Sequence, residues 1–562
     1  MALKNQWVGY ISRSYLQIKN SVLQRLSEIV PEVTDHSESN ILVIIIGIFS
    51  GIAEMLNYYI DNMARESFIT TARRYSSVVK HTRLIDYRIK SSIPSSVDIN
   101  LSFTDLDNNE VPSGASFVIP KGTIFNTENN IQFLSVTDTT VNEGDKNCII
   151  NAQQKTFVDS ALIGQTDGSD DQVFSLGSNY VHNSMVLEIG SEPWLLVNTL
   201  GRSEPEDKHY IVDISVEKIA YIKFGDNING KKPEAGKNII GSYYTTLGSG
   251  GNVDANTINQ TNFDFSNILG FNVPKVIISN KLKAVAGTDY EDIERIRRSA
   301  PLHLRTLERA VTEQDYIDIA MLSPGVDKAN LSYKCGKYID IYISPNGGGI
   351  AQSALLQSTK DYFSTRKMIT TFVNILPAGE SFITLDLEVT AKFRMDGIQT
   401  KKDIVDALMD YYSYNNSDIN RKIRKSDIIS LVDNLYKVDY LTLNGLYLKP
   451  YIRPVNHQNT LLYNIDLKPG NTTKKNWKLQ FDGSNMRLYN NQLFVGDIAI
   501  GQTYTDPSNS ITILISDNNY EVGQEWVFVT YPINENIETD DFSIPVIREQ
   551  DIKIIVNEQL SI

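Results

Sequence analysis

Hydrophobic residues recur at helical spacing through the first part of the chain. Between positions 7 and 29 they follow one another at intervals of three or four residues, the pattern of a helix that packs against another helix. These seam positions are Trp7, Ile11, Tyr15, Ile18, Val22, Leu26 and Ile29. Pro31 is expected to end this helix, and Ser37 or Ser39 to cap the next one, because a serine hydroxyl accepts hydrogen bonds from the free amides of a helix start. A third helix is predicted over residues 70–83.

An uncharged apolar run at residues 41–53 lies in the second of these helices. It stops at Glu54, short of the roughly 20 residues that cross a bilayer. The sequence therefore predicts a fully buried helix and no membrane span. A helix that is apolar on every side must be enclosed by other elements or by other chains. The pattern leaves two alternatives open, which are a self-contained three-helix domain and a bundle completed by another subunit.

The second alternative predicts a subunit interface on the two first helices. The residues expected to face a partner chain come from the seam and from the apolar run. They are Trp7, Ile11, Ile18, Val22, Leu26, Ile29, Ile44 and Ile48.

After Ser91 the period of the pattern changes to two, which is typical of half-buried strands. The first alternating positions are Val97, Ile99, Leu101 and Phe103. Short alternating runs separated by turn sequences continue to about residue 280. Two helices then follow, a charged one at 289–299 that leads through Ala300-Pro301 into a link at 302–309, and one that opens at Thr312.

Strand–helix–strand order beyond these helices indicates α+β units, and the chain becomes β-like again from Pro450. A long strand is predicted at 382–393, with Ile383, Leu385, Leu387 and Val389 on one face. The predicted fold class is multidomain α+β. It comprises a helical bundle at 1–92, a β-rich domain at 93–285, an α+β domain at 286–449 and a β-rich C-terminal appendage at 450–562. Joints that allow rigid-body motion are expected near residues 91 and 285.

Composition limits the functions that the chain can have. Its 562 residues are too many for one core, and its net charge of -14 argues against a nucleic-acid partner, which would favour a basic surface. The two cysteines, Cys148 and Cys335, lie far apart, and the six histidines are scattered singly. Neither pattern has the spacing of a zinc site or of a disulfide framework.

Two short segments resemble ligand sites but lack their defining residues. The acidic stretch at 166–171 has no EF-hand spacing, and the glycines at 347–349 have neither the lysine of a P-loop nor a dinucleotide fingerprint. Solvated turns are the better interpretation of both segments. We therefore predict no catalytic residue, no cofactor-binding residue and no metal site, and we do not expect an enzyme.

Four stretches of the sequence, taken together and in order, carry a resemblance to a known family. They are NMARESFITTARRYSSVVKHTRLIDY at 62–87, IPKGT at 119–123, FGDNING at 224–230 and AGTDYEDIERIRRSAPLHLRTLERAVTEQDYIDIAMLSPGV at 286–326. In this order they resemble the baseplate J-like family, the wedge proteins of contractile phage tails and related contractile injection systems. Each stretch alone is weak, because glycine and proline punctuate many β-proteins.

The resemblance covers residues 40–445 and implies a structural role. Members of that family associate with other copies of themselves and with a second baseplate wedge protein that has helical segments, partly through an N-terminal helical bundle. The wedges form a ring around the tail hub, close to the sheath, and the ring rearranges on contraction. The resemblance thus implies a virion protein of the tail baseplate, assembled in the cytoplasm of the bacterial host. It does not extend to residues 450–562.

Three other interpretations are weighed against this one. The arginines of the fourth stretch could contact nucleic acid, but interleaved acidic residues favour a salt-bridged helix surface or a subunit contact. A tail-associated receptor-binding or fibre protein would account for the β-rich end of the chain, although no internal repeat supports it. A cell-wall or glycan hydrolase would need paired carboxylates, and no motif points to a pair.

Overall fold

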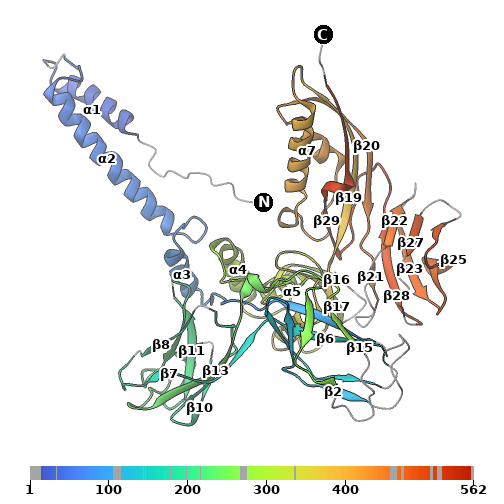
Figure 1. Ribbon diagram of the computed structural model, residues 1–562. Coiled ribbons are helices and arrows are strands. Elements are labelled where there is room, and N and C mark those ends of the chain that lie inside the picture. Colours follow the sequence, from blue (N-terminus) through green and yellow to red (C-terminus); the bar gives the residue numbers. More distant parts are fainter. Residues whose placement is uncertain are drawn as a thin grey trace.

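A computed structural model shows N-terminal helices followed by a β-rich body (Figure 1). It describes residues 14–558 except for 33–34, 105–115, 143–144, 146, 171, 178, 198, 216, 266–274, 334–336, 456–464, 470–473, 507–510, 516–519 and 521. The predicted multidomain α+β layout is confirmed at this level. The predicted domain boundaries stay predictions, apart from the last one, which is corrected below.

Helices α1 (Tyr15–Ile29) and α2 (Ile41–Glu66) lie side by side and project from the body, while α3 (Tyr75–Leu84) lies at its surface (Figure 1). Ser14 and Gln17 form a capping box at the start of α1. The side chain of Asn40, not of Ser37 or Ser39, caps α2, because its oxygen accepts the amide of Leu42. The predicted serine cap was therefore wrong. We refer to α1 and α2 together as the arm.

The body begins with a six-stranded sheet in the order β14-β3-β4-β6-β1-β15. Its strands are β1 (Ser96–Thr104), β3 (Ile124–Thr127), β4 (Gln132–Ser135), β6 (Asn147–Gln153), β14 (Ile258–Thr261) and β15 (Lys275–Ser279). A two-stranded sheet of β2 (Phe117–Ile119) and β5 (Thr139–Val141) accompanies it. The predicted alternation of β1 is confirmed, since its four apolar side chains are all buried in this sheet's core.

A second, seven-stranded sheet is inserted between β6 and β14, in the order β7-β13-β9-β10-β11-β12-β8. Its strands are β7 (Thr156–Gln165), β8 (Val173–Gly177), β9 (Val186–Ile189), β10 (Glu192–Leu196), β11 (His209–Ile214), β12 (Ala220–Phe224) and β13 (Asn238–Thr245). The sheet is barrel-like, because its end strands touch: a Cβ added at Gly164 of β7 would lie 2.7 Å from the Phe174 ring of β8.

Helices α4 (Ile293–Thr306) and α5 (Glu313–Leu322) lead into a three-stranded sheet. Its strands β16 (Val326–Tyr333), β17 (Tyr338–Pro345) and β18 (Phe372–Pro377) lie in that order, and α6 (Ser353–Ser364) connects the parallel pair β17 and β18. Helix α4 continues through Pro301, so the predicted helix end at 299 and the link at 302–309 were wrong. The missing proline N–H removes one helical bond, but the buried side chains of Ile296, Ala300 and Thr306 hold both halves of the helix against the body.

The next unit is a sheet built on the long strand β19 (Gly379–Ala391). Strand β20 (Val438–Lys449) pairs with it antiparallel, and β29 (Ser543–Val546) and β30 (Ile552–Asn557) pair with it in parallel. Helices α7 (Gly397–Tyr411) and α8 (Lys425–Asp433) share its core. The predicted burial of Ile383, Leu385, Leu387 and Val389 is confirmed. Strands β29 and β30 return to β19, so the prediction of a separate appendage at 450–562 was wrong.

The segment between β20 and β29 forms two small sheets around its own core. One contains β21 (Arg453–Pro454), β28 (Glu525–Thr530), β23 (Lys475–Phe481), β24 (Asn485–Asn490) and β25 (Leu493–Ala499), in that order. The other contains β22 (Ile465–Pro469), β27 (Ile511–Ile515) and β26 (Thr503–Thr505). Trp477 and Trp526 lie in the core, where the indole N–H of Trp477 donates to Thr530 Oγ1 at 2.8 Å. This unit is therefore an insertion into the β19 sheet.

The two predicted joints near residues 91 and 285 lie against each other. The amide of Ile93 donates to Thr288 O at 2.8 Å, and the amides of Ser96 and Val285 donate to each other's carbonyl oxygens. The side chains of both segments are mostly buried. Paired, buried backbone does not rotate freely, so these two segments, which we call the spine, argue against free joints at residues 91 and 285.

Candidate subunit interface on the N-terminal helices

The arm is a hairpin that closes along one side of α2. A Cβ added at Gly47 would lie 2.9 Å from the Tyr15 hydroxyl oxygen, so the glycine lets α1 approach closely. The backbone amide of Tyr15 donates to Glu54 Oε1 at 3.0 Å, so the first charged residue after the apolar run satisfies the start of α1. Ile18 and Leu26 are half-buried. Part of the predicted seam thus serves to pair α1 with α2.

The rest of α2 is exposed over its whole length. Of its 26 residues only Val43 and Ser50 are buried. Val43 is buried and Ile46 is half-buried, while the exposed large apolar side chains range from 43% at Ile45 to 73% at Ile41 and Met63. Within this chain the prediction of a fully buried helix was therefore wrong, since α1 covers only one side. Among the helices of the described part, α2 alone has the length and hydropathy of a bilayer-crossing segment, a test that core helices of soluble proteins also pass.

The predicted interface residues divide into three groups. Trp7 and Ile11 lie outside the described residues. Ile18 and Leu26 are half-buried, as described above. Val22, Ile29, Ile44 and Ile48 are exposed by 43%, 70%, 48% and 60%. The side chains of the last group are exposed, as a subunit interface requires, and their contact with a partner chain stays a prediction.

The exposed face of α2 extends well beyond the predicted residues. The further apolar side chains are Ile41, Leu42, Ile45, Phe49, Ile52, Met55, Leu56, Tyr58, Tyr59, Ile60 and Met63. The sequence does carry a signal for the second half of this set, because Met55, Leu56, Tyr59 and Met63 continue at helical spacing beyond Glu54.

The alternative of a self-contained three-helix domain is not observed. The buried residues Val78 and Val79 of α3 pack in a cluster with Ile214 of β11 and Ile296 of α4. Helix α3 thus belongs to the surface of the body, and it leaves the arm without a third helix.

Three arginines of the 286–326 stretch, Arg295, Arg297 and Arg305, lie on α4 and form ion pairs, in line with the predicted salt-bridged helix surface. Arg295 lies 3.9 Å from Glu291, and Arg297 pairs with Glu294. Arg305 of α4 pairs with Asp318 of α5, whose side chain is fully buried. These pairs fix α4 against its neighbours.

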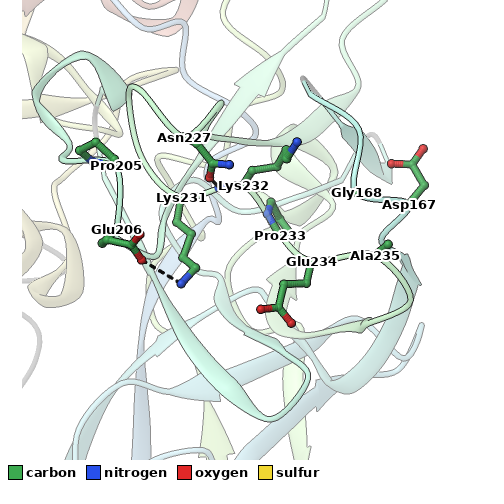
Figure 2. A pocket seen from close by; sticks show the side chains of 10 residues that line it. All are labelled: Asp167, Gly168, Pro205, Glu206, Asn227, Lys231, Lys232, Pro233, Glu234 and Ala235. Carbon is green, nitrogen blue, oxygen red and sulfur yellow. Dashed lines mark hydrogen bonds and ion pairs between the residues drawn. The ribbon is translucent and has the colours of Figure 1, made fainter.

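The loops at one end of the seven-stranded sheet surround an open depression of about 630 Å³ (Figure 2). The FGDNING stretch contributes Asn227, and the residues that follow it form one wall. Both lysines here are paired, Lys231 with Glu206 at 3.0 Å and Lys232 with Asp170 at 3.0 Å. A depression whose cations are already neutralised offers no charge to hold an anionic ligand.

The described ranges show neither a cluster of metal ligands nor an activated thiol. No three His, Cys, Asp or Glu side chains converge there as metal ligands do. Burial and the neighbouring Asp145 raise the pKa of Cys148 to about 11, so its thiol is not an activated nucleophile. Cys335 lies outside the described residues.

The comparisons with known proteins fall on the arm and on the body. Residues 14–84 match the model of a family described as bacteriophage baseplate protein, N-terminal domain. Over 412 residues the chain is 23% identical to the baseplate wedge protein gp6 of Enterobacteria phage T4. The predicted resemblance to baseplate wedge proteins is confirmed. That alignment covers 66% of this chain and 60% of the relative, so the chain spans about three fifths of the relative's length.

A solved structure, the six-fold symmetrised baseplate of the anti-feeding prophage, is also similar. Its matching chain is 12% identical, with 76% of this chain and 86% of that chain covered. The TM-score is 0.27, too low for any argument from its geometry. The baseplate domain match is more informative, because it ends at Leu84, where α3 ends. The part similar to a baseplate domain is therefore the arm together with the helix that attaches it to the body.

Proposed function

We propose that this chain is a structural subunit of a contractile-tail baseplate, and that its arm forms a helical bundle with other copies and with a second wedge protein that has helical segments. The exposed apolar face of α2 carries the proposal. Burying one large aliphatic or aromatic side chain contributes about 1.5–3 kcal/mol, so a partner that covers even half of this face gains enough to offset the cost of association. The match of residues 14–84 to a baseplate domain supports the same region as the assembling part.

A protein partner suits this face better than a lipid bilayer does. The residues that join α1 to α2 include Glu32, Asp35 and Glu38, all exposed at the tip of the hairpin. A spanning α2 would have to carry this charged tip, with the α1 helix that is packed on it, through the hydrocarbon layer, at a cost of several kcal/mol per charge. A helical bundle leaves the tip in water.

The subunit would act as a stiff link in a ring around the tail hub, next to sheath components, in the virion baseplate assembled in the host cytoplasm. The paired segments near residues 93 and 285 support stiffness within the body. The ring would then rearrange on contraction by movement between subunits and at the base of the arm, not between the two halves of the body.

The test is an aspartate in the exposed face of α2. Ile48 is 60% exposed, so Ile48→Asp should leave the isolated chain folded but should abolish its incorporation into baseplates, because a partner would bury an unpaired carboxylate. Leu162→Asp is the matched control, since Leu162 is a 68% exposed apolar residue of the body. Incorporation is measured by co-expression with the other baseplate proteins and electron microscopy.

Two results would contradict the proposal. One is that Ile48→Asp enters complete baseplates as the wild type does. The other is that the purified wild-type chain floats with lipid vesicles and Ile48→Asp does not, which would assign the face to a membrane instead.

A further inference from the structure

The arm meets the body at a sharp corner between α2 and α3, residues 67–74. Among the described residues, this corner connects the projecting hairpin to the folded units, whereas the spine near residues 93 and 285 is buried and paired. Phe68 at the corner is 57% exposed, while Ala72 is buried and Ile69 packs against the same cluster, which includes Ile296 of α4. The position of the corner therefore depends on this packing together with the polar contacts of the corner.

Arg297 of α4 makes the contacts that tie the corner to the body. Its Nε donates to the carbonyl oxygen of Ile69 at 3.1 Å, and its Nη2 donates to the carbonyl oxygen of Ala72. The guanidinium also pairs with Glu294 on its own helix. The planar fork of arginine fixes the angle between its donors, whereas the donors of an ammonium group rotate about the side-chain axis. The positive charge also lies just beyond the C-terminal end of α2, where the helix dipole favours a cation.

Bonds within the corner stiffen it on the arm side. The Glu66 carboxylate accepts the amides of Arg73 at 2.9 Å and Arg74 at 3.2 Å. Although burial acts in the opposite direction, these bonds hold the pKa of Glu66 below its usual range. The Thr71 hydroxyl donates to Arg65 O at 2.7 Å. The corner is thus a preformed loop that presents the Ile69 and Ala72 carbonyls to α4.

Helix α4 itself is fixed to the body on its other side. The buried Glu291, just before α4, accepts the Tyr87 hydroxyl at 2.7 Å, and Lys90 donates its Nζ to the carbonyl of Leu322 at the end of α5. Arg295 donates to Val326 O at 2.7 Å. Because α4 cannot move without these groups, a corner tied to α4 moves with the body.

We infer that Arg297 is a positioning residue that latches the arm to α4 and so sets the direction in which the arm leaves the body. The latch consists of two directional bonds to backbone oxygens, which fix the angle of the corner beside the apolar contacts of Ile69 and Ala72. This device goes beyond the proposed function, because it is a property of the isolated chain whatever binds the arm.

The experiment measures the arm-to-body distance in the isolated full-length chain by double electron–electron resonance. Spin labels replace the exposed residues Gln24 of α1 and Glu188 of β9, in a chain with Cys148 and Cys335 changed to serine and diluted with unlabelled protein. The unsubstituted arm should give one narrow distance distribution. Arg297→Met should broaden it at least two-fold, because methionine keeps the apolar stem without the donors.

The matched control is Arg298→Met. Arg298 is the neighbouring arginine on the same helix and is exposed, so this change should leave the distribution narrow. Arg297→Lys, which keeps the charge but loses the fixed geometry of the guanidinium donors, should give an intermediate width. An unchanged width for Arg297→Met would overturn the latch.

Hydrogen exchange of α3 and α4 separates a latch from a folding role. If Arg297 acts as a latch, the amide exchange rates of both helices in Arg297→Met should lie within three-fold of the wild-type rates. Much faster exchange there would show that Arg297 is needed to fold this surface, and would also overturn the inference. Neither outcome depends on assembly, so failure of the latch is distinguishable from failure of the proposed interface.

Discussion

Replacing Arg305 by methionine should destabilise the α4–α5 unit far more than neutralising its partner does. The Asp318 carboxylate is fully buried and accepts Arg305 Nε at 2.6 Å, Arg305 Nη2 and Gln314 Nε2 at 2.9 Å. Arg305→Met leaves this buried charge with the Gln314 amide alone. Breaking a buried pair costs about 3–5 kcal/mol, and the lower end applies here because Arg305 is 52% exposed and part of its charge is already in water.

Removing the carboxylate charge instead, by Asp318→Asn, should lower the free energy of unfolding by only about 1 kcal/mol. Asp318→Asn removes the buried charge, its amide oxygen still accepts a bond, and the half-exposed guanidinium of Arg305 can turn to solvent. For the same reason the double variant, Arg305→Met with Asp318→Asn, should be more stable than Arg305→Met alone. Two groups in direct contact are expected to deviate from additivity in this way.

The assay is hydrogen exchange of peptides from α5, because a chain of several units does not unfold in one step. A cost of about 3 kcal/mol corresponds to exchange faster by roughly 150-fold. Arg309→Met is the control, since Arg309 is exposed, and it should leave exchange unchanged. Equal effects of Arg305→Met and Asp318→Asn, or a double variant that is less stable than Arg305→Met, would refute the reasoning.

Two further predictions concern other parts of the body. Burial raises the pKa of Asp98 to about 6, against the opposing bonds from the Ser353 hydroxyl and amide. Its folded pKa exceeds the ordinary value of 3.8, so its contribution to stability is present below about pH 4 and is lost as pH rises through 6. Asp98→Asn should flatten this dependence, worth about 3 kcal/mol at most, in hydrogen exchange of β1 and α6 peptides compared with the wild type at each pH between 4 and 8, and an unchanged slope would contradict it. A Cβ added at Gly225 would lie 2.2 Å from Gly230 O, so Gly225→Ala should destabilise the seven-stranded sheet by about 1–3 kcal/mol in hydrogen exchange, whereas Gly250→Ala, whose Cβ would meet Leu247 Cβ at an ordinary 3.8 Å, should not.

Local patterns predicted the elements well where the period of the sequence matches the period of burial. The alternating residues of β1 and β19 are buried as expected, because one face of each strand lies on a core. Helix ends were predicted less well. Asn40 and Ser39 are both good caps by residue type, and only the local backbone decides which side chain reaches the Leu42 amide.

Pairing between distant strands could not be predicted from such patterns. Strands β29 and β30 return to β19 after an inserted unit of two sheets, and nothing in their alternation specifies a partner. The same holds for the spine, where the change of period at residue 91 was interpreted as a joint. A change of period marks the end of one element, but it does not show whether the connecting segment is free or bonded to a segment far along the chain.

The arm shows what apolar patterning establishes and what it does not. A run such as 41–53 requires that water be excluded from the helix, and this requirement holds whichever molecule excludes it. Among the described residues α1 is the helix packed along α2, and the Gly47 contact and the Glu54 bond confine it to one side of α2. The exposed side chains continue past Glu54 to Met63, close to the corner, so a covering partner would lie along the arm from its tip almost to the body. A partner seated in this way would lie next to the bonds of Arg297, and its binding would therefore be sensitive to the direction of the arm.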